Sequence, residues 1–334
     1  MEVAAIDIGG TKLAMGIVHE GGQIIASTVI PTPKKPEDGL GAINNYVKTN
    51  WGAYDIGAIG VGAPAVVGGE NGGYFLPNPS NLAAWGNFNL KKNLDQLIND
   101  SVGKKVPLSI ESDVYPATAA ELLVRNSLFG DLKSHSLFPF FYLTISTGVG
   151  GEQAIMDGTT WKIYRNENGV AKVGHGEFKG IAPNQKPIEC NYEGFDCAET
   201  YLGGNHMLAR YGLKPEDASP EMMAMVAKNL GKFLYQNELT RNSKIIVVGG
   251  KIANEWNKRY PFLDEAKDCM LMLFNQNYLP APSLEASILG DDVGLVGWWA
   301  IAMKQLTGKW PKYQIPLIPS ADYAKTFQPF PAIL

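Results

Sequence analysis

The first residues able to do chemistry lie in a glycine turn close to the N-terminus. Two apolar runs flank Gly9 and Gly10 and predict a tight β-hairpin, because glycine takes positive φ without steric cost. Asp7, Thr11 and Lys12 surround this turn. Backbone amides, a hydroxyl and an ammonium group can hold phosphate oxygens, and a neighbouring carboxylate can hold hydrated Mg²⁺. The alternative is an ordinary structural hairpin.

Two further glycine turns could serve the same ligand. Thr147 and Gly148 follow the apolar run 140–146 and again offer a hydroxyl with free amides, so two turns from two domains can clamp a triphosphate from both sides. Gly249 and Gly250 follow a β-branched run and would let a flat ring approach the backbone closely. The alternatives are a second structural hairpin and a plain βα turn.

A carboxylate stands where a predicted strand ends, in the sequence Glu111-Ser112-Asp113. The strand covers 106–110, and Pro116 marks the first turn of the helix that follows. In an α/β sheet, a side chain at the carboxyl end of a strand points into the crevice where ligands bind. Asp113 is therefore a candidate catalytic acid or base. It can also cap the helix, and the two roles are compatible.

The elements that must position these groups alternate between strand and helix. Strands are expected at 3–8, 13–18, 23–30, 56–61, 106–110, 140–146, 152–156 and 244–248, and helices at 39–49, 89–97, 116–125, from 219 onwards and at 294–305. Residues 157–196 show neither pattern and are expected to be irregular. Each of two blocks opens on a strand-turn-strand unit with glycines, which indicates an α/β fold, although no repeat is visible at the residue level.

Composition indicates a globular protein long enough for two domains. The chain has 334 residues, 45% of them hydrophobic and 19% charged, with a net charge of −4 and no basic block. Nucleic acid or an anionic membrane is therefore not expected as the main partner. No run approaches the roughly 18 apolar residues of a transmembrane helix. The motif-bearing strand at the start argues against a signal peptide, and three cysteines argue for a reducing compartment, so we expect a cytoplasmic protein.

Eight short motifs follow one another along the chain. They are Asp-Ile-Gly-Gly-Thr-Lys, Gly-Val-Gly-Ala-Pro, Pro-Ser-Asn-Leu-Ala-Ala-Trp, Glu-Ser-Asp, Ser-Thr-Gly-Val-Gly-Gly, Val-Gly-His, Val-Gly-Gly and Leu-Gly-Asp-Asp-Val-Gly-Leu-Val-Gly. Each is weak alone, but the series, from about residue 3 to about residue 305, resembles the ROK family of sugar kinases and repressors. The resemblance implies an α/β fold of the actin-like ATPase (ribonuclease H-like) type, with two lobes and a central cleft. The expected lobes are 1–113 plus about 290–334, and 114–289.

The resemblance also implies roles for individual residues. Asp113 would be the general base that accepts the proton of a sugar 6-hydroxyl as it attacks the γ-phosphate of ATP, and Asp7 would lie near Mg²⁺. The phosphate-facing residues would be Gly9, Gly10, Thr11, Lys12, Thr147 and Gly148, while Gly249 and Gly250 would line the adenosine pocket. The sugar-binding residues would be Asn81, Ser112, Asp113, His175 and Glu199. A homodimer would be usual for the family.

Two positions in the expected sugar site depart from the family pattern. The usual Asn-Asp pair is Ser112-Asp113 here, and Lys172 replaces the usual Glu three residues before His175. An ammonium group only donates hydrogen bonds, so Lys172 can bind an acyl carbonyl or an anionic group but cannot accept from ring hydroxyls. Alternatively, Lys172 swings to solvent and a nearby acid such as Glu177 binds the sugar. The expected substrate is therefore glucose or a related or N-acylated hexose.

The zinc site of the resembled family, one His and three Cys, is incomplete in this chain. The matching residues are His175, Cys190 and Cys197. Tyr192 stands where the third Cys belongs, and a structural zinc normally needs four ligands. Asp196 or Glu193 can substitute with oxygen, and the alternative is two ordinary buried thiols beside a sugar-binding His. We expect substoichiometric zinc or none. A further histidine, His206, is expected to be a surface or satisfied polar residue.

Two other functions compete with an ATP- and Mg²⁺-dependent hexose kinase. Repressors of the family carry a helix-turn-helix segment ahead of the first motif, but only two residues precede Val3 here and the charge is negative, which disfavours DNA binding. A sugar-binding protein without catalysis would explain Ser112 and Lys172, but the retained Asp113 argues against it. The implied phosphoryl donor is ATP, and another phosphoryl donor is the alternative.

Overall fold

The computed structural model describes residues 1–63, 67–68, 74–75, 82–86, 88–112, 114–129, 137–158, 160–164, 173–190, 194 and 196–314. The first elements are β1 (Glu2–Ile8), β2 (Lys12–Val18), β3 (Ile24–Pro31), α1 (Pro36–Trp51), β4 (Ile56–Ala63), β5 (Val67–Gly68), β6 (Tyr74–Phe75), η2 (Ala83–Trp85), α2 (Leu90–Val102), β7 (Leu108–Ser112) and α3 (Val114–Phe129). They are followed by β8 (Phe140–Ile145), β9 (Val149–Asp157), β10 (Thr160–Ile163), η4 (Val173–His175), α5 (Glu199–Leu202), α6 (Gly204–Tyr211), η5 (Pro215–Asp217), α7 (Pro220–Arg241), β11 (Ile245–Gly249), α8 (Lys251–Arg259), α9 (Phe262–Gln276), β12 (Ser283–Ala286), η6 (Gly290–Asp292) and α10 (Val293–Thr307).

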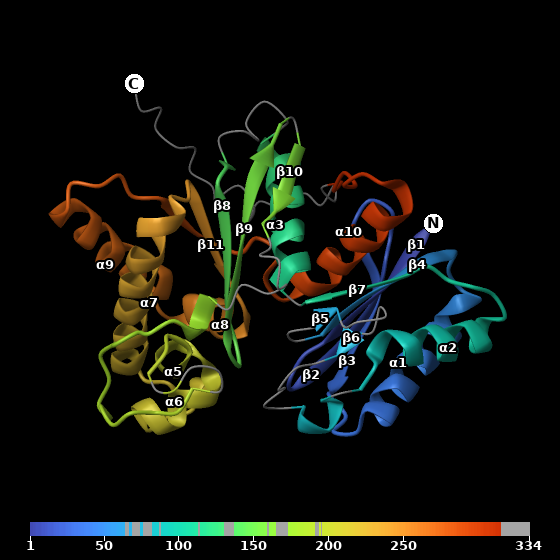
Figure 1. The fold of residues 1–334 in the computed structure, drawn as a ribbon, viewed down its shortest axis with the longest axis horizontal. Coiled ribbons are helices and arrows are strands. Elements are labelled where there is room, and N and C mark those ends of the chain that lie inside the picture. Colours follow the sequence, from blue (N-terminus) through green and yellow to red (C-terminus); the bar gives the residue numbers. More distant parts are fainter. Residues whose placement is uncertain are drawn as a thin grey trace.

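The first sheet has the strand order β3-β2-β1-β4-β7 (Figure 1). β1 and β2 form the predicted antiparallel hairpin, whereas β1, β4 and β7 run parallel. Their side chains alternate between two faces. Ile6, Ile59 and Ile110 pack with α1 and α2, while the opposite face meets α10. The predicted strands and the α/β pattern are confirmed in this sheet.

The second sheet repeats this topology with the order β10-β9-β8-β11-β12. An antiparallel β8-β9-β10 meander is again followed by two strands parallel to its first member, β11 and β12. The prediction that residues 157–196 are irregular is wrong at β10, where Trp161 pairs with Met156 of β9. The Thr-Trp-Lys-Ile stretch is too short for its alternation to be distinguished from an irregular segment.

Two helices, α3 and α10, lie between the sheets and pack on each other (Figure 1). The close packing of α10 on the first sheet depends on small residues in β4. A Cβ on Gly60 would lie 2.4 Å from the carbonyl oxygen of Trp298, and one on Gly62 would lie 2.1 Å from the Trp298 ring. Residues of both sheets join α3 and α10 in one hydrophobic cluster, so the cores of the two halves are continuous through this helix pair.

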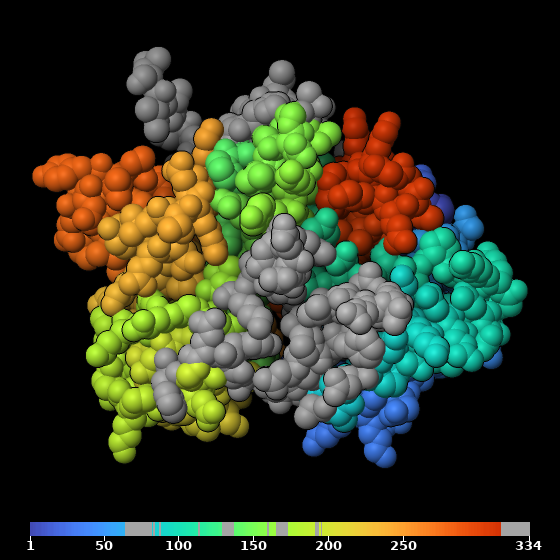
Figure 2. Space-filling model, viewed as in Figure 1, coloured from blue at the N-terminus to red at the C-terminus, as the bar shows by residue number. Residues whose placement is uncertain are grey.

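The segment after α10, residues 308–314, joins the two halves a second time. The Gln314 amide donates to the Gly21 carbonyl at 2.8 Å, next to the turn between β2 and β3. Trp310 stacks on Trp161 of β10, with ring centroids 4.3 Å apart and planes 15° from parallel. In the space-filling view, the red surface of α10 lies directly against the green strands of the second half (Figure 2). Across the described residues, we find no helix of the length and apolar character needed to cross a bilayer.

Candidate active site

Two predicted site residues, Asp7 and Ser112, lie at the carboxyl edge of the first sheet, where its parallel strands end side by side. Asp7 of β1 is paired with Gly62 of β4, which is paired with Glu111 of β7. Ser112 follows at the end of β7; its side chain is buried, and its hydroxyl has no hydrogen-bond partner among the described residues. A buried hydroxyl without a partner is costly, so Ser112 is suited to bind a polar ligand group.

The Asp7 carboxylate is enclosed by the first hairpin and the start of α10. A Cβ on Gly294 of α10 would lie 2.6 Å from Asp7 Oδ2, so only glycine allows the helix to begin so close. Desolvation by the packed protein raises the pKa of Asp7, while the Lys12 ammonium group opposes this shift. A cation bound here would favour the charged carboxylate and oppose the effect of desolvation, as the Lys12 ammonium group does.

Glycine is required at position 9 for a reason other than the predicted positive φ. Gly9 does not have positive φ. Its amide donates to the Lys12 carbonyl at 2.8 Å, and a Cβ would lie 2.9 Å from that carbonyl oxygen. Thr32 of the neighbouring segment holds the turn from outside, because its hydroxyl donates to the Gly9 carbonyl at 2.7 Å. The close backbone approach, and not a left-handed conformation, requires glycine at this position.

An acid that the sequence analysis did not assign faces the same turn. Asp292 precedes α10, and its pKa is raised by desolvation and by Asp291, while Lys12 lowers it. Lys12 of the first hairpin thus lies within electrostatic reach of both Asp7 and Asp292. The motif Gly-Asp-Asp at 290–292 was visible in the sequence, but only the fold brings it to Lys12.

The second and third glycine turns adjoin each other, as their predicted shared ligand requires. Gly250 has a φ of +92°, and a Cβ there would lie 2.5 Å from the Ile145 carbonyl oxygen at the end of β8. The Lys251 amide at the start of α8 donates to the Ser146 hydroxyl at 3.0 Å. On the other side, the Asn205 amide of α6 donates to the Thr147 carbonyl at 3.0 Å.

Glu199 connects the second turn with the region of the predicted sugar-binding residues. Its side chain is buried, and Oε2 accepts a hydrogen bond from the Val149 amide at 2.9 Å. A Cβ on Gly148 would lie only 2.5 Å from this oxygen, so the carboxylate rests directly on the turn. Burial raises the pKa of Glu199, although the Val149 hydrogen bond partly offsets this effect.

Two histidines flank the Glu199 carboxylate. His175 Nε2 lies 3.8 Å from Oε2, and His206 Nε2 lies 3.9 Å from Oε1. Burial, with a smaller contribution from Arg210, lowers the pKa of His206. The sequence analysis did not place His206 in the site, because a lone histidine on a helix carries no pattern; its only signal is its distance of seven residues from Glu199.

The three residues that match the zinc pattern do come together. His175 Nδ1 lies 3.3 Å from Cys190 Sγ and 3.8 Å from Cys197 Sγ, and all three side chains are buried. They supply three donors. Of the two oxygen donors considered for the fourth position, Glu193 lies outside the described residues, and Asp196 directs Oδ1 to the Arg210 guanidinium and the Ile188 amide. The described residues therefore do not fit a four-coordinate structural zinc.

Several predicted site residues lie outside the described residues. These are Asn81, Asp113, Lys172, Tyr192 and Glu193. The chain neighbours of Asp113 are described: Ser112 ends β7, and Val114 begins α3. Val114 Cγ2 lies 2.7 Å from the position of a Cβ on Gly150, so the start of α3 abuts the strand that follows the second turn.

The family can now be identified. The profile of the ROK family matches residues 3–305, and the chain belongs to this family. A glucokinase of Streptomyces coelicolor (strain ATCC BAA-471 / A3(2) / M145) is 31% identical over 217 residues, 65% of this chain and 60% of that protein. The N-acetylmannosamine kinase of Escherichia coli K12 is 27% identical over 274 residues, 75% of this chain and 84% of that protein. The match thus spans about 60% of the length of the glucokinase.

Solved structures of ROK proteins share the fold of this chain. A ROK family glucokinase from Streptomyces griseus, in complex with glucose and AMPPNP, has a TM-score of 0.69 at 23% identity, covering 91% of this chain and 100% of that one. A ROK hexokinase from Thermus thermophilus has a TM-score of 0.64 at 22% identity, covering 92% and 100%. At such identities they show the fold alone. The α/β fold of the actin-like ATPase type is thereby confirmed.

Proposed function

We propose that the chain is a sugar kinase that transfers the γ-phosphoryl group of ATP to the 6-hydroxyl of glucose or a related or N-acylated hexose. The contact between Glu199 and the second glycine turn carries this proposal. A predicted sugar-binding carboxylate accepts a hydrogen bond at 2.9 Å from Val149, the residue after the predicted phosphate-binding Gly148. Phosphoryl transfer needs the sugar and the phosphate chain in contact, and a protein that only bound sugar would not need this junction.

The residues suit the roles that phosphoryl transfer requires. The amides of the two turns and the Lys12 ammonium group would bind phosphate oxygens, and Gly249 with Gly250 would pass under the adenosine. Asp113 would accept the proton of the sugar hydroxyl as its oxygen bonds to the γ-phosphorus and ADP leaves. Asp7 and Asp292 have carboxylates suited to Mg²⁺, which when bound neutralises charge on the phosphates.

A panel of sugars tests the proposal. The purified protein is incubated with Mg²⁺-ATP and glucose, mannose, galactose, N-acetylglucosamine or N-acetylmannosamine, and ADP release is coupled to NADH oxidation. We expect sugar-dependent ADP formation with at least one hexose and a phosphorylated sugar in the mass spectrum. Inorganic polyphosphate replaces ATP in a parallel series that identifies the donor. A binding protein without catalysis would be favoured if calorimetry shows sugar binding but ATP hydrolysis is absent or is unchanged by every sugar.

Lys172 provides a test of substrate choice. The side chain of Lys172 can donate to an N-acyl carbonyl or an acidic substituent, so unmodified glucose should have a high KM. Lys172→Glu restores an acceptor and should shift the ratio of kcat/KM values from N-acetylated hexoses towards glucose. An unchanged ratio would place Lys172 outside the sugar site. Lys179→Glu, in the same region but with an exposed side chain, is the matched control.

A further inference from the structure

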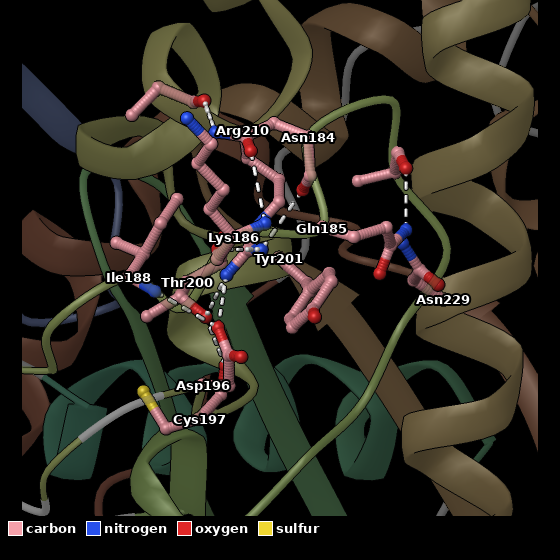
Figure 3. A network of polar contacts seen from close by, with 12 residues as sticks. Asn184, Gln185, Lys186, Ile188, Asp196, Cys197, Thr200, Tyr201, Arg210 and Asn229 are labelled. Carbon is pink, nitrogen blue, oxygen red and sulfur yellow. Dashed lines mark hydrogen bonds and ion pairs between the residues drawn. The ribbon is translucent and has the colours of Figure 1, made fainter.

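The guanidinium group of Arg210 is completely buried in α6, and every N–H donor it carries has a partner (Figure 3). Nε donates to the Thr200 carbonyl at 3.2 Å. One terminal nitrogen donates to the Asn184 and Lys186 carbonyls, both at 3.1 Å. The other donates to Asp196 Oδ1 and to the Thr200 hydroxyl. Five donors are thus distributed over two stretches of chain, 184–186 and 196–200.

Arg210 therefore fixes the loop that carries the Glu199 segment. Asp196 has a φ of +59°, a conformation that a residue other than glycine adopts only when its surroundings hold it there. Oδ1 also accepts from the Ile188 amide at 3.2 Å, and the Asp196 amide donates to the Ile188 carbonyl at 3.0 Å. Thr200 extends this hydrogen-bond network to Cys197, since its hydroxyl donates to the Cys197 carbonyl at 2.8 Å.

The same helix also docks on the phosphate-binding turn. The amides of Gly204 and Asn205, at the start of α6, donate to the Ser146 and Thr147 carbonyls at 2.9 and 3.0 Å. Arg210 lies near the other end of this helix and stacks over the Tyr201 ring at 4.0 Å. One short helix thus ties the second turn to the loop in which Asp196 and Thr200 bracket Glu199.

We propose that Arg210 is a positioning residue that holds Glu199 against the second turn, and that its hydrogen bonds replace a structural zinc in ordering residues 182–190 and 196–200. The part of the proposal that concerns sugar rests on the proposed kinase function. The three donors His175, Cys190 and Cys197 lie beside this network, but Asp196, one of the two carboxylates considered as a further ligand, is bound to Arg210 instead. The Arg210 guanidinium, a cation that belongs to the chain itself, thus anchors this loop.

Arg210→Lys tests the proposal because lysine keeps the charge but cannot reach five acceptors from one planar fork. We expect the KM for sugar to rise about 10- to 100-fold, with kcat and the KM for ATP within about threefold of the wild type. Hydrogen exchange should accelerate in residues 182–190 and 196–200 and stay unchanged in α7 and α9. Arg259→Lys is the matched control, because Arg259 also donates to backbone carbonyls but is exposed on α8. An unchanged sugar KM and unchanged exchange would overturn the proposal.

Thr200→Val provides a milder variant that keeps the side-chain volume if Arg210→Lys does not fold. It removes one acceptor of the guanidinium and the side-chain hydrogen bond to the Cys197 carbonyl, so the same changes should appear on a smaller scale, and Thr200→Ser should restore wild-type values. Wild-type exchange and sugar KM in Thr200→Val would contradict the assignment. If no hexose is phosphorylated, the proposed function fails, but exchange in residues 182–190 and 196–200 still decides the role of Arg210.

The absence of a structural zinc is tested with the wild-type protein. Elemental analysis after purification without added metal should find far less than one zinc per chain, and EDTA should change neither the melting temperature nor exchange in residues 182–190 and 196–200. One zinc per chain, with loss of protection on chelation, would overturn the replacement of zinc by Arg210.

Discussion

Gly148→Ala tests whether the Glu199 carboxylate must rest on the second glycine turn. The φ of Gly148 is not positive, so alanine can adopt this backbone without strain. The new Cβ would, however, lie 2.5 Å from Glu199 Oε2. Because ordinary carbon contacts begin near about 3.5 Å, the carboxylate must retreat by roughly 1 Å. The hydrogen bond from the Val149 amide, 2.9 Å in the native protein, would then be lost or strongly weakened.

The size of the effect follows from that hydrogen bond. A hydrogen bond to a charged group contributes about 1.5–3 kcal/mol, which corresponds to roughly a 10- to 100-fold change in an equilibrium constant. We therefore expect the KM for sugar to rise by that factor and to rise more than the KM for ATP, since the turn amides remain in place. Initial rates with each substrate varied at saturating concentration of the other measure both constants.

The control for this experiment is Gly176→Ala. Gly176 follows His175, has no atom within 4 Å of the position that a Cβ would occupy, and does not have positive φ. Its substitution should leave both constants unchanged. If folded Gly148→Ala has a sugar KM within about twofold of the wild type, Glu199 does not act on sugar through this contact, and the proposed active site is wrong in this respect.

Two more substitutions test other parts of the structure. Desolvation raises the pKa of Asp7 above its ordinary 3.8. The folded state is therefore favoured while Asp7 is protonated, and this contribution to stability is lost as the pH rises through the folded-state pKa. In Mg²⁺-free buffer, Asp7→Asn should therefore have a higher melting temperature than the wild type, and the difference should be larger at pH 8 than at pH 4, although the variant loses turnover. An equal difference at both pH values in calorimetry would contradict this. Trp310→Ala removes the stack on Trp161 and should lower the free energy of unfolding in urea by about 1–3 kcal/mol, whereas Lys309→Ala should not; equal values for the two would show that residues 308–314 do not join the halves.

The sequence predicts those parts of the site that depend on short stretches of chain. The hairpin at Gly9 and the turns at Thr147 and Gly250 each follow a recognisable apolar strand, so their existence and order could be stated in advance. The reason for glycine at Gly9 could not, because the conflict with the Lys12 carbonyl arises only in the folded turn. Strand β10 was missed because four residues give too little alternation.

Contacts between distant segments were beyond prediction from the sequence. Asp292 meets Lys12 across 280 residues of chain, and Glu199 meets Val149 across 50. Arg210 gave no signal, since one arginine on an amphipathic helix is usually solvated. Its significance comes from complete burial and from acceptors on two segments, 184–186 and 196–200, that the tertiary structure brings to α6.

The most direct test of the proposed kinase chemistry is Asp113→Asn, with substrate binding and turnover measured on the same preparation. Asparagine keeps the shape of the side chain but cannot accept the hydroxyl proton as a base. We predict that sugar and ATP bind with affinities within about threefold of the wild type in calorimetry, while kcat falls by about 10²–10⁴-fold. Turnover within a few-fold of the wild type, with the same sugar, would show that Asp113 is not the base and would contradict the proposed mechanism.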